Sequence, residues 1–249
     1  MVPIVLIRGL LRESGHWKPL VEALQARMPN QIILTPNVAG NGSLYFRQSP
    51  SQIEKMLPAL LEQLPEEYET FHVVAISMGS MLASVWAKAH PHQVATLTMI
   101  NPSFSRFSPF WQRINIKALT AILASKLKGR RDFEATILYY TCQKALKSPA
   151  TLDRHVALAT KHPVSFGNAI RQLLAAARFK GFAEAPNTQV QIIVSSDDQL
   201  VSSECGRAIA NAWKVELVEF NSQSHDLPLS KPFDLANHLS HWTEDNRRY

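Results

Sequence analysis

The chain has 249 residues and a formal net charge of +6; 46% of the residues are hydrophobic and 18% are charged, which excludes a disordered or low-complexity protein. Its two cysteines, Cys142 and Cys205, are too few for a disulfide framework and lack the spacing of a zinc or redox motif. No apolar run reaches the roughly 18 residues of a membrane span, and the N-terminus lacks the pattern of a secretory signal, so we expect a cytoplasmic protein built mainly as one domain.

Short apolar runs alternate with helical patterns in the first hundred residues. Strands are predicted at 3–7, 32–34, 72–76 and 94–100, because continuous short apolar runs are typical of parallel strands buried on both faces. Helices are predicted at 20–28, 51–64 and 78–90, the second with Ser51 and Glu54 spaced as a capping box. This alternation predicts an α/β protein with a doubly wound, mostly parallel sheet.

The alternation stops after the fourth strand. Between 103 and 185 only helical patterns are found, at 111–127, 133–146, 152–160 and 166–179. Strands are predicted again at 190–194 and 215–220, with helices at 203–213 and 232–242. We therefore expect residues 1–102 and 186–249 to form the α/β core and residues 103–185 to form an inserted helical cap.

Ser77 lies where the third strand passes directly into a helix. The small residues Ala75 and Gly79, two positions before and after it, suit a tight turn in which strand and helix cross closely. Such a turn holds a serine exposed and strained at the positive end of the helix. The pattern predicts a nucleophile elbow with Ser77 as the nucleophile.

A nucleophilic serine needs a base, and the base needs an acid that orients it. Asp198 follows the strand at 190–194 and is the predicted acid, with its neighbour Asp197 as the alternative. His225 follows the last strand and is the predicted base; the chain order serine, aspartate, histidine agrees with this fold. The chain has nine histidines, and His155 and His162 fall in the cap, where a substrate contact is conceivable.

The oxyanion that forms during attack on a carbonyl needs backbone N–H donors. We expect one donor at Met78, directly after the nucleophile, and the other at Leu10, in the loop after the first strand. Gly9 lets the backbone of that loop approach closely. Loops at the ends of separate strands thus converge on one site.

The sequence resembles the α/β-hydrolase superfamily over nearly its whole length. Arg8-Gly9 stands where the family usually has His-Gly, residues 39–43 look like its Pro-Gly-His-Gly-x-Ser loop, and 225–228 look like its catalytic-histidine loop. The resemblance implies a catalytic triad of Ser77, Asp198 and His225, with no metal or cofactor. It also implies that the chain starts at the family's third strand, without the usual first hairpin.

Three departures from the family pattern affect the site. Arg8 replaces a residue that helps to shape the oxyanion loop, and its guanidinium is expected to be able to reach a carboxylate or phosphate of the substrate. Ala75 and Ser80 replace glycines of the elbow. Both are small, so we expect the turn to form.

The cap is expected to determine the choice of substrate. Phe104, Phe107, Phe110 and Trp111 are apolar enough to line an acyl pocket, although packing of the cap onto the sheet explains them equally well. The cap also carries a basic stretch, for which a solvated face is the default interpretation. The alternative is an acidic partner, such as an acyl carrier protein, or an anionic membrane surface. The stretch consists of Arg106, Arg113, Lys117, Lys126, Lys128, Arg130 and Arg131.

The first hypothesis for function is a serine hydrolase that cleaves a carboxylic ester or thioester of a small-molecule acyl substrate. The second keeps the fold and triad but uses them for C–C bond hydrolysis or an elimination. The third is a binding protein without enzymatic activity, because a fold alone does not establish a reaction. Nucleic-acid binding ranks last, because the basic stretch contains no recognition motif.

Overall fold

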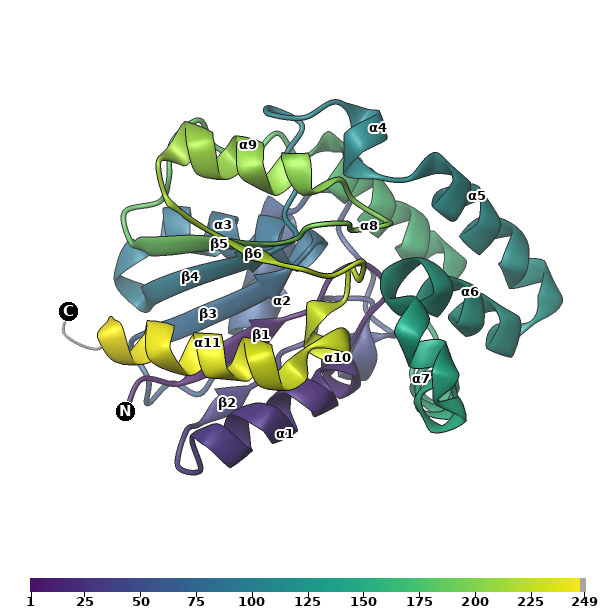
Figure 1. Cartoon of the computed structure of the whole chain (residues 1–249), viewed down its shortest axis with the longest axis horizontal. Helices are drawn as coiled ribbons and strands as arrows, with labels where there is room; N and C mark the ends of the chain where they lie inside the picture. Colours follow the sequence, from purple (N-terminus) through teal and green to yellow (C-terminus); the bar gives the residue numbers. More distant parts are fainter. Residues whose placement is uncertain (247–249) are drawn as a thin grey trace.

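The apolar runs predicted as strands pair with one another in the computed structural model, which describes residues 1–246 (Figure 1). They form a six-stranded sheet of parallel neighbours in the order β2-β1-β3-β4-β5-β6. The strands are β1 (Ile4–Ile7), β2 (Ile33–Leu34), β3 (Phe71–Ile76), β4 (Val94–Ile100), β5 (Gln189–Ser195) and β6 (Glu216–Phe220). The predicted doubly wound, parallel α/β sheet is confirmed.

Helices cover both faces of the sheet. One face packs against α2 (Leu57–Leu61), α3 (Met78–Ala89) and α9 (Ser203–Trp213). The other packs against α1 (Lys18–Arg27), α10 (Leu227–Ser230) and α11 (Pro232–Asp245). Successive strand residues point to opposite faces of the sheet, and both faces are covered. The strands are therefore continuous apolar runs rather than alternating polar and apolar residues.

The strand order reverses at β1, which pairs with β2 on one side and with β3 on the other. The helix α1, which follows β1, and the helix α3, which follows β3, consequently pack on opposite faces. Such a reversal opens a crevice at the carboxyl ends of the two strands, and this is where open α/β sheets bind ligands. The topology thus places a site at the ends of β1 and β3.

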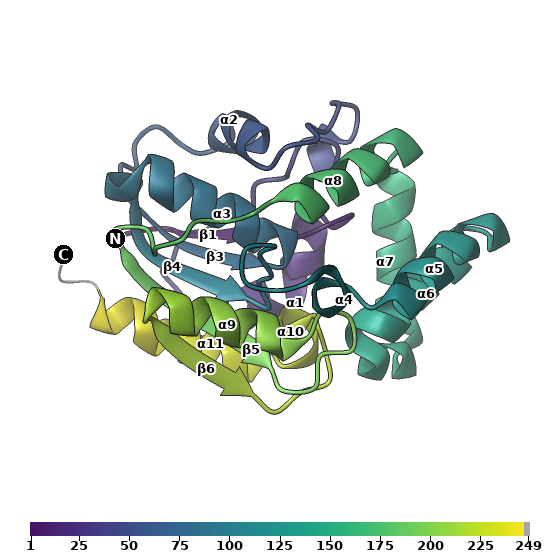
Figure 2. The same ribbon diagram turned by 90° about the horizontal axis from the view of Figure 1, so that it is seen from above.

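Residues 101–188, between β4 and β5, contain no strand. Their helices, here called the α4–α8 segment, are α4 (Phe110–Arg113), α5 (Ile116–Ser125), α6 (Arg130–Cys142), α7 (Pro149–Lys161) and α8 (Phe166–Arg178). Helices α4 to α7 lie beyond the carboxyl ends of the strands, and the chain after α8 returns past α3 to the start of β5 (Figures 1 and 2). In the part of the chain that the structure describes, none of the helices is long and apolar enough to cross a bilayer.

Two predicted helices are wrong in detail. The helix expected at 111–127 is interrupted at Ile114, which is extended, and at Asn115, whose side chain accepts the N–H of Ala118 (3.2 Å) and starts a new helix. The capping box expected at Ser51 is not formed. Instead the chain makes a 3-10 turn before α2, because Pro58 has no N–H to continue a helix and is tolerated only in the first turn.

Helix α3 begins very close to the carboxyl end of β1. A Cβ atom on Gly79 would lie 2.5 Å from the carbonyl oxygen of Ile7 and 2.7 Å from that of Arg8. Both obstacles are backbone atoms, which cannot rotate away as a side chain can. Only glycine therefore fits at this crossing of strand and helix.

Replacement of Gly79 by alanine should lower the free energy of unfolding by about 1–3 kcal/mol, because the new methyl group overpacks the crossing. Urea unfolding of the wild type and of Gly79→Ala measures the difference. Gly167→Ala in α8 is the matched control, because the nearest atom to its new Cβ is the end of the flexible Arg171 side chain at 3.2 Å. Equal losses in the two variants would contradict the explanation.

Candidate active site

Ser77 occupies a strained turn between β3 and α3. Its φ of 56° and ψ of −124° form a combination that residues other than glycine rarely adopt. The N–H of Ser77 donates to the carbonyl oxygen of Ile100 (2.9 Å), and its own carbonyl oxygen accepts the N–H of Ser80 (2.9 Å). These bonds hold the turn with Ser77 on the wall of a cavity at the carboxyl edge of the sheet.

The elbow forms with Ala75 and Ser80 in place of glycine. Ala75 is fully buried in β3. Ser80 is also fully buried, and its Oγ donates to the carbonyl oxygen of Ala75 (2.9 Å). The hydroxyl of Ser80 is thus used inside the turn, which leaves Ser77 as the serine of this turn that faces the cavity.

His225 forms a hydrogen bond with Asp198. The Nδ1 atom of His225 lies 2.6 Å from Oδ2 of Asp198, and the Asp198 side chain is fully buried. The other oxygen, Oδ1, accepts the N–H groups of Leu200 (2.8 Å) and Val201 (3.1 Å), which fix the carboxyl group in place. Asp197 is exposed and accepts a hydrogen bond from Ser196 instead, so Asp198 is the aspartate in contact with His225.

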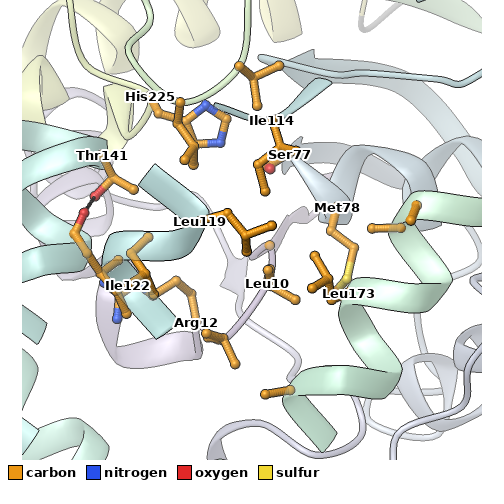
Figure 3. A pocket seen from close by; sticks show the side chains of 18 of the residues that line it. Leu10, Arg12, Ser77, Met78, Ile114, Leu119, Ile122, Thr141, Leu173 and His225 are labelled. Atoms are coloured by element: carbon orange, nitrogen blue, oxygen red, sulfur yellow. Dashed lines mark hydrogen bonds between the residues drawn. The ribbon is translucent and has the colours of Figure 1, made fainter. Parts of the chain in front are cut away.

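Ser77 and His225 line the same cavity, and Figure 3 shows the imidazole beside Ser77. The Nε2 atom of His225 is buried and forms no hydrogen bond within the described residues, so the Ser77–His225 hydrogen bond is not made. In enzymes without substrate such bonds are often long and tighten only in the complex. The structure thus joins His225 to Asp198 and places Ser77 on the same wall of the cavity.

The expected oxyanion donors lie on both sides of Ser77. Met78 is the first residue of α3, and its N–H has no partner inside the helix. Leu10 is the second residue of a turn that the N–H of Arg12 closes on the carbonyl oxygen of Gly9 (3.3 Å), a bond that does not use the N–H of Leu10. A Cβ on Gly9 would lie 3.1 Å from the Cβ of Ser77, so the two loops are in close contact.

The cavity beside Ser77 has a volume of about 180 Å³ and a mainly apolar wall (Figure 3). One side comes from the loop after β1 and from the elbow. The opposite side comes from the α4–α8 segment, whose apolar contributions include Ile114, Leu119, Ile122, Ile137 and Leu173. The arrangement resembles a slot for an apolar chain that ends at Ser77.

Residues 4–238 match the alpha/beta hydrolase family. The chain belongs to this family.

Relatives within and around the family act on different substrates. A protein named carbamate hydrolase RutD, from Azorhizobium caulinodans, is 26% identical over 211 residues, which cover 84% of this chain and 78% of the relative. A thermophilic esterase from Thermogutta terrifontis is similar in structure with a TM-score of 0.72 and 16% identity, over 99% of this chain and 90% of that one. An enol-lactonase from Burkholderia xenovorans LB400 has a TM-score of 0.74 and 15% identity, over 100% and 92%. At such identities the structural likeness shows the fold, and the alpha/beta hydrolase fold hosts several reactions.

Three of the four aromatic residues expected to line an acyl pocket lie elsewhere. Phe104 is fully buried and packs against Phe179 and Trp213, with ring centroids 5.3 and 5.6 Å away. Phe107 packs at the margin of the same core, and Trp111 is 72% exposed. Phe110 lines the cavity beside Ser77, and the other three do not. The apolar wall combines aliphatic side chains with Phe110, Phe133 and Phe166. The aliphatic residues have the pattern of any amphipathic helix, so the sequence did not mark them as a pocket.

Arg8 borders the cavity, but its guanidinium is held by Asp226, the residue after His225. Nη1 donates to Oδ1 (3.1 Å) and Nη2 to Oδ2 (2.5 Å), and both residues are 4% exposed. Burial alone would raise the pKa of Asp226, but the charge and hydrogen bonds of Arg8 outweigh it and lower this pKa. The guanidinium also lies over the ring of Trp17, 4.7 Å from its centroid. Arg8 therefore ties the loop after β1, which carries the expected oxyanion donor Leu10, to the loop of His225. Its guanidinium is paired with Asp226 instead of being free for the expected contact with a substrate anion.

Asn101, at the end of β4, is a positioning residue that the sequence pattern did not reveal. Its Nδ2 donates to the carbonyl oxygen of His225 (2.8 Å), and its Oδ1 accepts the N–H of Ser195 (2.8 Å). The Oγ of Ser195 in turn donates to the carbonyl oxygen of Ser224 (2.6 Å). The carboxyl ends of β4 and β5 thus fix the backbone at His225. A φ of 47° at Asn101 would have been the only local signal, and a sequence does not display it.

Helix α8 connects to the oxyanion loop through Gln172, which is fully buried. Its Oε1 accepts the N–H of Leu11 (3.2 Å), and its Nε2 donates to Oδ1 of Asn41 (2.7 Å) and to Oγ of Ser49 (3.0 Å). Asn41 belongs to the loop at 39–43, and its Nδ2 donates to the carbonyl oxygen of Arg12 (3.0 Å). Hydrogen bonds therefore connect α8, the loop at 39–43 and the turn at 9–12 into one unit.

The basic stretch does not form one uniform face. Arg113 is buried and donates to the carbonyl oxygens of Ala176 (2.6 Å) and Ala177 (3.0 Å). Arg131 pairs with Asp153 (2.6 Å), and the ammonium of Lys126 lies over the ring of Phe166. The four remaining members, Arg106, Lys117, Lys128 and Arg130, are exposed.

A buried cluster of Arg12, His16, Glu134 and His155 lies between the oxyanion loop and the α4–α8 segment. The ligand atoms of His16, Glu134 and His155 lie within 4.8 Å of one another, as in a metal site. The guanidinium of Arg12, however, donates to Oε2 of Glu134 (2.7 Å) and lies 3.5 Å from Nε2 of His16. Arg12 already supplies the positive charge, and its repulsion opposes a metal ion there.

Both histidines of the cluster are neutral at pH 7. Burial, and next the charge of Arg12, hold the pKa of His16 well below its usual value. The same two causes lower the pKa of His155 to about 3. Protonation of either ring would place a second cation beside Arg12 in a buried environment.

The pairing of Arg8 with Asp226 predicts a strong coupling between the two side chains. Arg8→Met should lower the free energy of unfolding by about 3–5 kcal/mol, because it leaves a buried carboxylate without its partner. The double variant Arg8→Met/Asp226→Leu should recover most of this loss, since no unpaired charge remains. Urea unfolding of both single variants and the double variant gives the coupling; simple additivity would refute it.

The low pKa of His155 predicts that the protein loses stability in mild acid. In the unfolded chain this histidine has a pKa near 6.5, whereas in the folded chain the value is about 3. Between these values the unfolded chain binds more protons, so the free energy of unfolding falls as the pH drops, by about 2 kcal/mol for this group at pH 5.

Urea unfolding of the wild type and of His155→Gln at pH 7 and pH 5 tests this origin. The variant should lose less stability between the two pH values than the wild type. His92→Gln, at an exposed position, is the control and should keep the wild-type difference. A wild-type pH dependence in the His155 variant would show that other groups cause it.

Proposed function

We propose that the protein is a serine hydrolase that cleaves a carboxylic ester or thioester through an acyl-enzyme on Ser77. The observation that carries the proposal is the strained turn that aims Ser77 into the cavity that His225 also lines, with His225 bonded to Asp198. The strained backbone of Ser77 destabilises the fold, so stability does not explain this conformation. Strained residues of this kind cluster at active sites, which supports a catalytic role for Ser77.

The reaction follows the general course for a serine nucleophile. Nε2 of His225 takes the proton of Ser77 as Oγ attacks the carbonyl carbon, and Asp198 stabilises the imidazolium. The N–H groups of Leu10 and Met78 stabilise the oxyanion. His225 then gives the proton to the leaving alcohol or thiol. Water, deprotonated by His225, releases the acid from Ser77.

The acyl group is the part of the substrate best matched to the cavity. Its aliphatic wall at Leu119, Ile122 and Leu173 favours burial of a hydrocarbon chain, at roughly 0.8 kcal/mol per CH₂ group. A small polar carbamate, the substrate named for the RutD relative, would leave this wall in contact with water. We therefore place residues 103–185 as a cap that selects the acyl chain.

The arrangement of the basic residues does not favour an acidic carrier protein or an anionic surface over solvent. Arg113 is buried, and Arg131 and Lys126 have partners within the chain. The proposed substrate is accordingly a small acyl ester or thioester.

Ser77→Ala should lower kcat for a nitrophenyl ester by a factor on the order of 10⁴–10⁶, and Asp198→Asn by about 10⁴. A fluorophosphonate probe should label the wild type at Ser77 and fail to label Ser77→Ala. Ser51→Ala, at a serine outside the cavity, is the control and should be labelled as the wild type is. A folded wild type that resists the probe would contradict the nucleophile. If the probe labels Ser77 but the enzyme turns over a diketone far faster than any ester, this result would favour C–C bond hydrolysis.

A further inference from the structure

A second cavity of about 250 Å³ adjoins the one beside Ser77. The two share the wall residues Leu11, Arg12, Lys126, Phe133 and Ala169. Whereas the first cavity is mainly apolar, the second is lined by many polar and charged side chains. These are Arg12, Glu13, His16, Asn41, Lys126, Arg130, Glu134 and His162.

The buried ionic groups of the second cavity are paired with one another. Arg12 donates to Glu134 (2.7 Å), and the Oε2 atom of Glu13 lies 2.7 Å from Nδ1 of His162. Arg12, Glu13 and Glu134 are 7%, 5% and 3% exposed. Neighbouring His16 stays neutral because burial lowers its pKa. The wall thus presents both signs of charge and no large excess of either.

Two polar atoms of this wall are left without a partner. Nη2 of Arg12 is a buried donor, and Oε1 of Glu13 is a buried acceptor; neither forms a hydrogen bond within the described residues. A buried polar group without a partner destabilises the fold, so such groups are uncommon and invite a ligand. A ligand group that both donates and accepts matches this combination of an unpartnered donor and an unpartnered acceptor.

The charges of the wall discriminate among such ligands. The buried charges of the wall are Arg12, Glu13 and Glu134, whereas Lys126 and Arg130 are exposed and their charges are screened by solvent. The buried carboxylates would repel a carboxylate ligand, and Arg12 would repel an ammonium group. A methyl group would leave both unpartnered atoms unsatisfied. A hydroxyl or a primary carboxamide carries a donor and an acceptor without a net charge and avoids each of these penalties.

We propose that the second cavity is a subsite for a neutral hydroxyl or carboxamide group at the far end of the substrate's acyl chain. The chain would run along the apolar wall from the ester at Ser77, and its polar end would enter the second cavity, which Arg12 and Glu13 line. This inference rests on the proposed function and names its substrate class: esters of acids with a neutral polar end.

The experiment compares nitrophenyl esters of equal chain length that end in methyl, hydroxyl, carboxamide, carboxylate or ammonium, in a series of increasing length. At the length that reaches the subsite, kcat/KM for the hydroxyl and carboxamide esters should exceed that of the methyl ester about tenfold or more. Equal rates for these esters at every length, or a preference for the carboxylate or ammonium end, would overturn the subsite.

Ala159→Phe, on the wall of the second cavity, should remove the preference by filling the space. Ala157→Phe, at an exposed position of the same helix α7, is the matched control and should keep it. A preference that survives Ala159→Phe would overturn the assignment to this cavity. Circular dichroism identifies a variant that fails to fold, and in that case the ester series on the wild type decides alone.

Calorimetric binding of the same esters to Ser77→Ala separates this inference from the proposed function. That variant should bind the hydroxyl and carboxamide esters about tenfold more tightly than the methyl ester, whether or not the wild type turns them over. Absence of turnover with this preference intact would contradict the hydrolase alone. Turnover without any preference would contradict the subsite alone.

Discussion

The close approach of α3 to the end of β1 is the constraint on which the rest of the site depends. The carbonyl oxygens of Ile7 and Arg8 leave no room for a Cβ atom on Gly79. Because α3 begins this close to the sheet, Ser77 must turn sharply and takes a φ of 56°. The same approach brings the loop of Gly9 and Leu10 against Ser77 and Met78. One packing contact thereby places the proposed nucleophile and both oxyanion donors.

The proposed base depends on a different set of interactions. His225 lies on a buried loop after the edge strand β6. Hydrogen bonds from Asn101 and to Ser224 hold the loop on one side, and the ion pair of Asp226 with Arg8 holds it on the other. A buried ion pair adds little net stability, because desolvation offsets much of the attraction. Its value here is positional, since it links the histidine loop to the oxyanion loop.

The features that can be predicted from the sequence are the parallel sheet and the placement of the candidate residues at its carboxyl edge, because these depend on local pattern and on sheet topology. Ser77, Asp198 and His225 each follow a strand, and parallel strands bring their carboxyl ends to one edge. That rule needs no knowledge of side-chain contacts. The helix break at Asn115 was missed because a single capping residue interrupted an otherwise continuous apolar pattern. The role of Arg8 was missed because its partner Asp226 lies at the other end of the chain, and pairing at that distance leaves no periodic trace.

The α4–α8 segment shows a further limit of prediction from pattern. Phe104 looked like a pocket residue, but an aromatic side chain in sequence carries no sign of the face on which it lies, and it packs in the core. Conversely, nothing in the sequence distinguishes Gln172 from other polar residues of a helix. Buried, it holds the N–H of Leu11, whose φ of 60° is unfavourable for leucine, and joins that turn to the loop of Asn41.

The α4–α8 segment therefore also holds part of the candidate site in place, in addition to covering it. The turn that carries Leu10 is strained at Leu11, and a strained turn persists only where its surroundings impose it. Gln172 is part of those surroundings, so displacement of α8 would leave the N–H of Leu11 unpaired and relax the turn. The geometry of the proposed oxyanion donor Leu10 and the position of the cavity wall therefore depend on the same helix, which carries Leu173 next to Gln172. A change in α8 that enlarges the cavity is accordingly expected to affect the proposed reaction as well as the fit of a substrate.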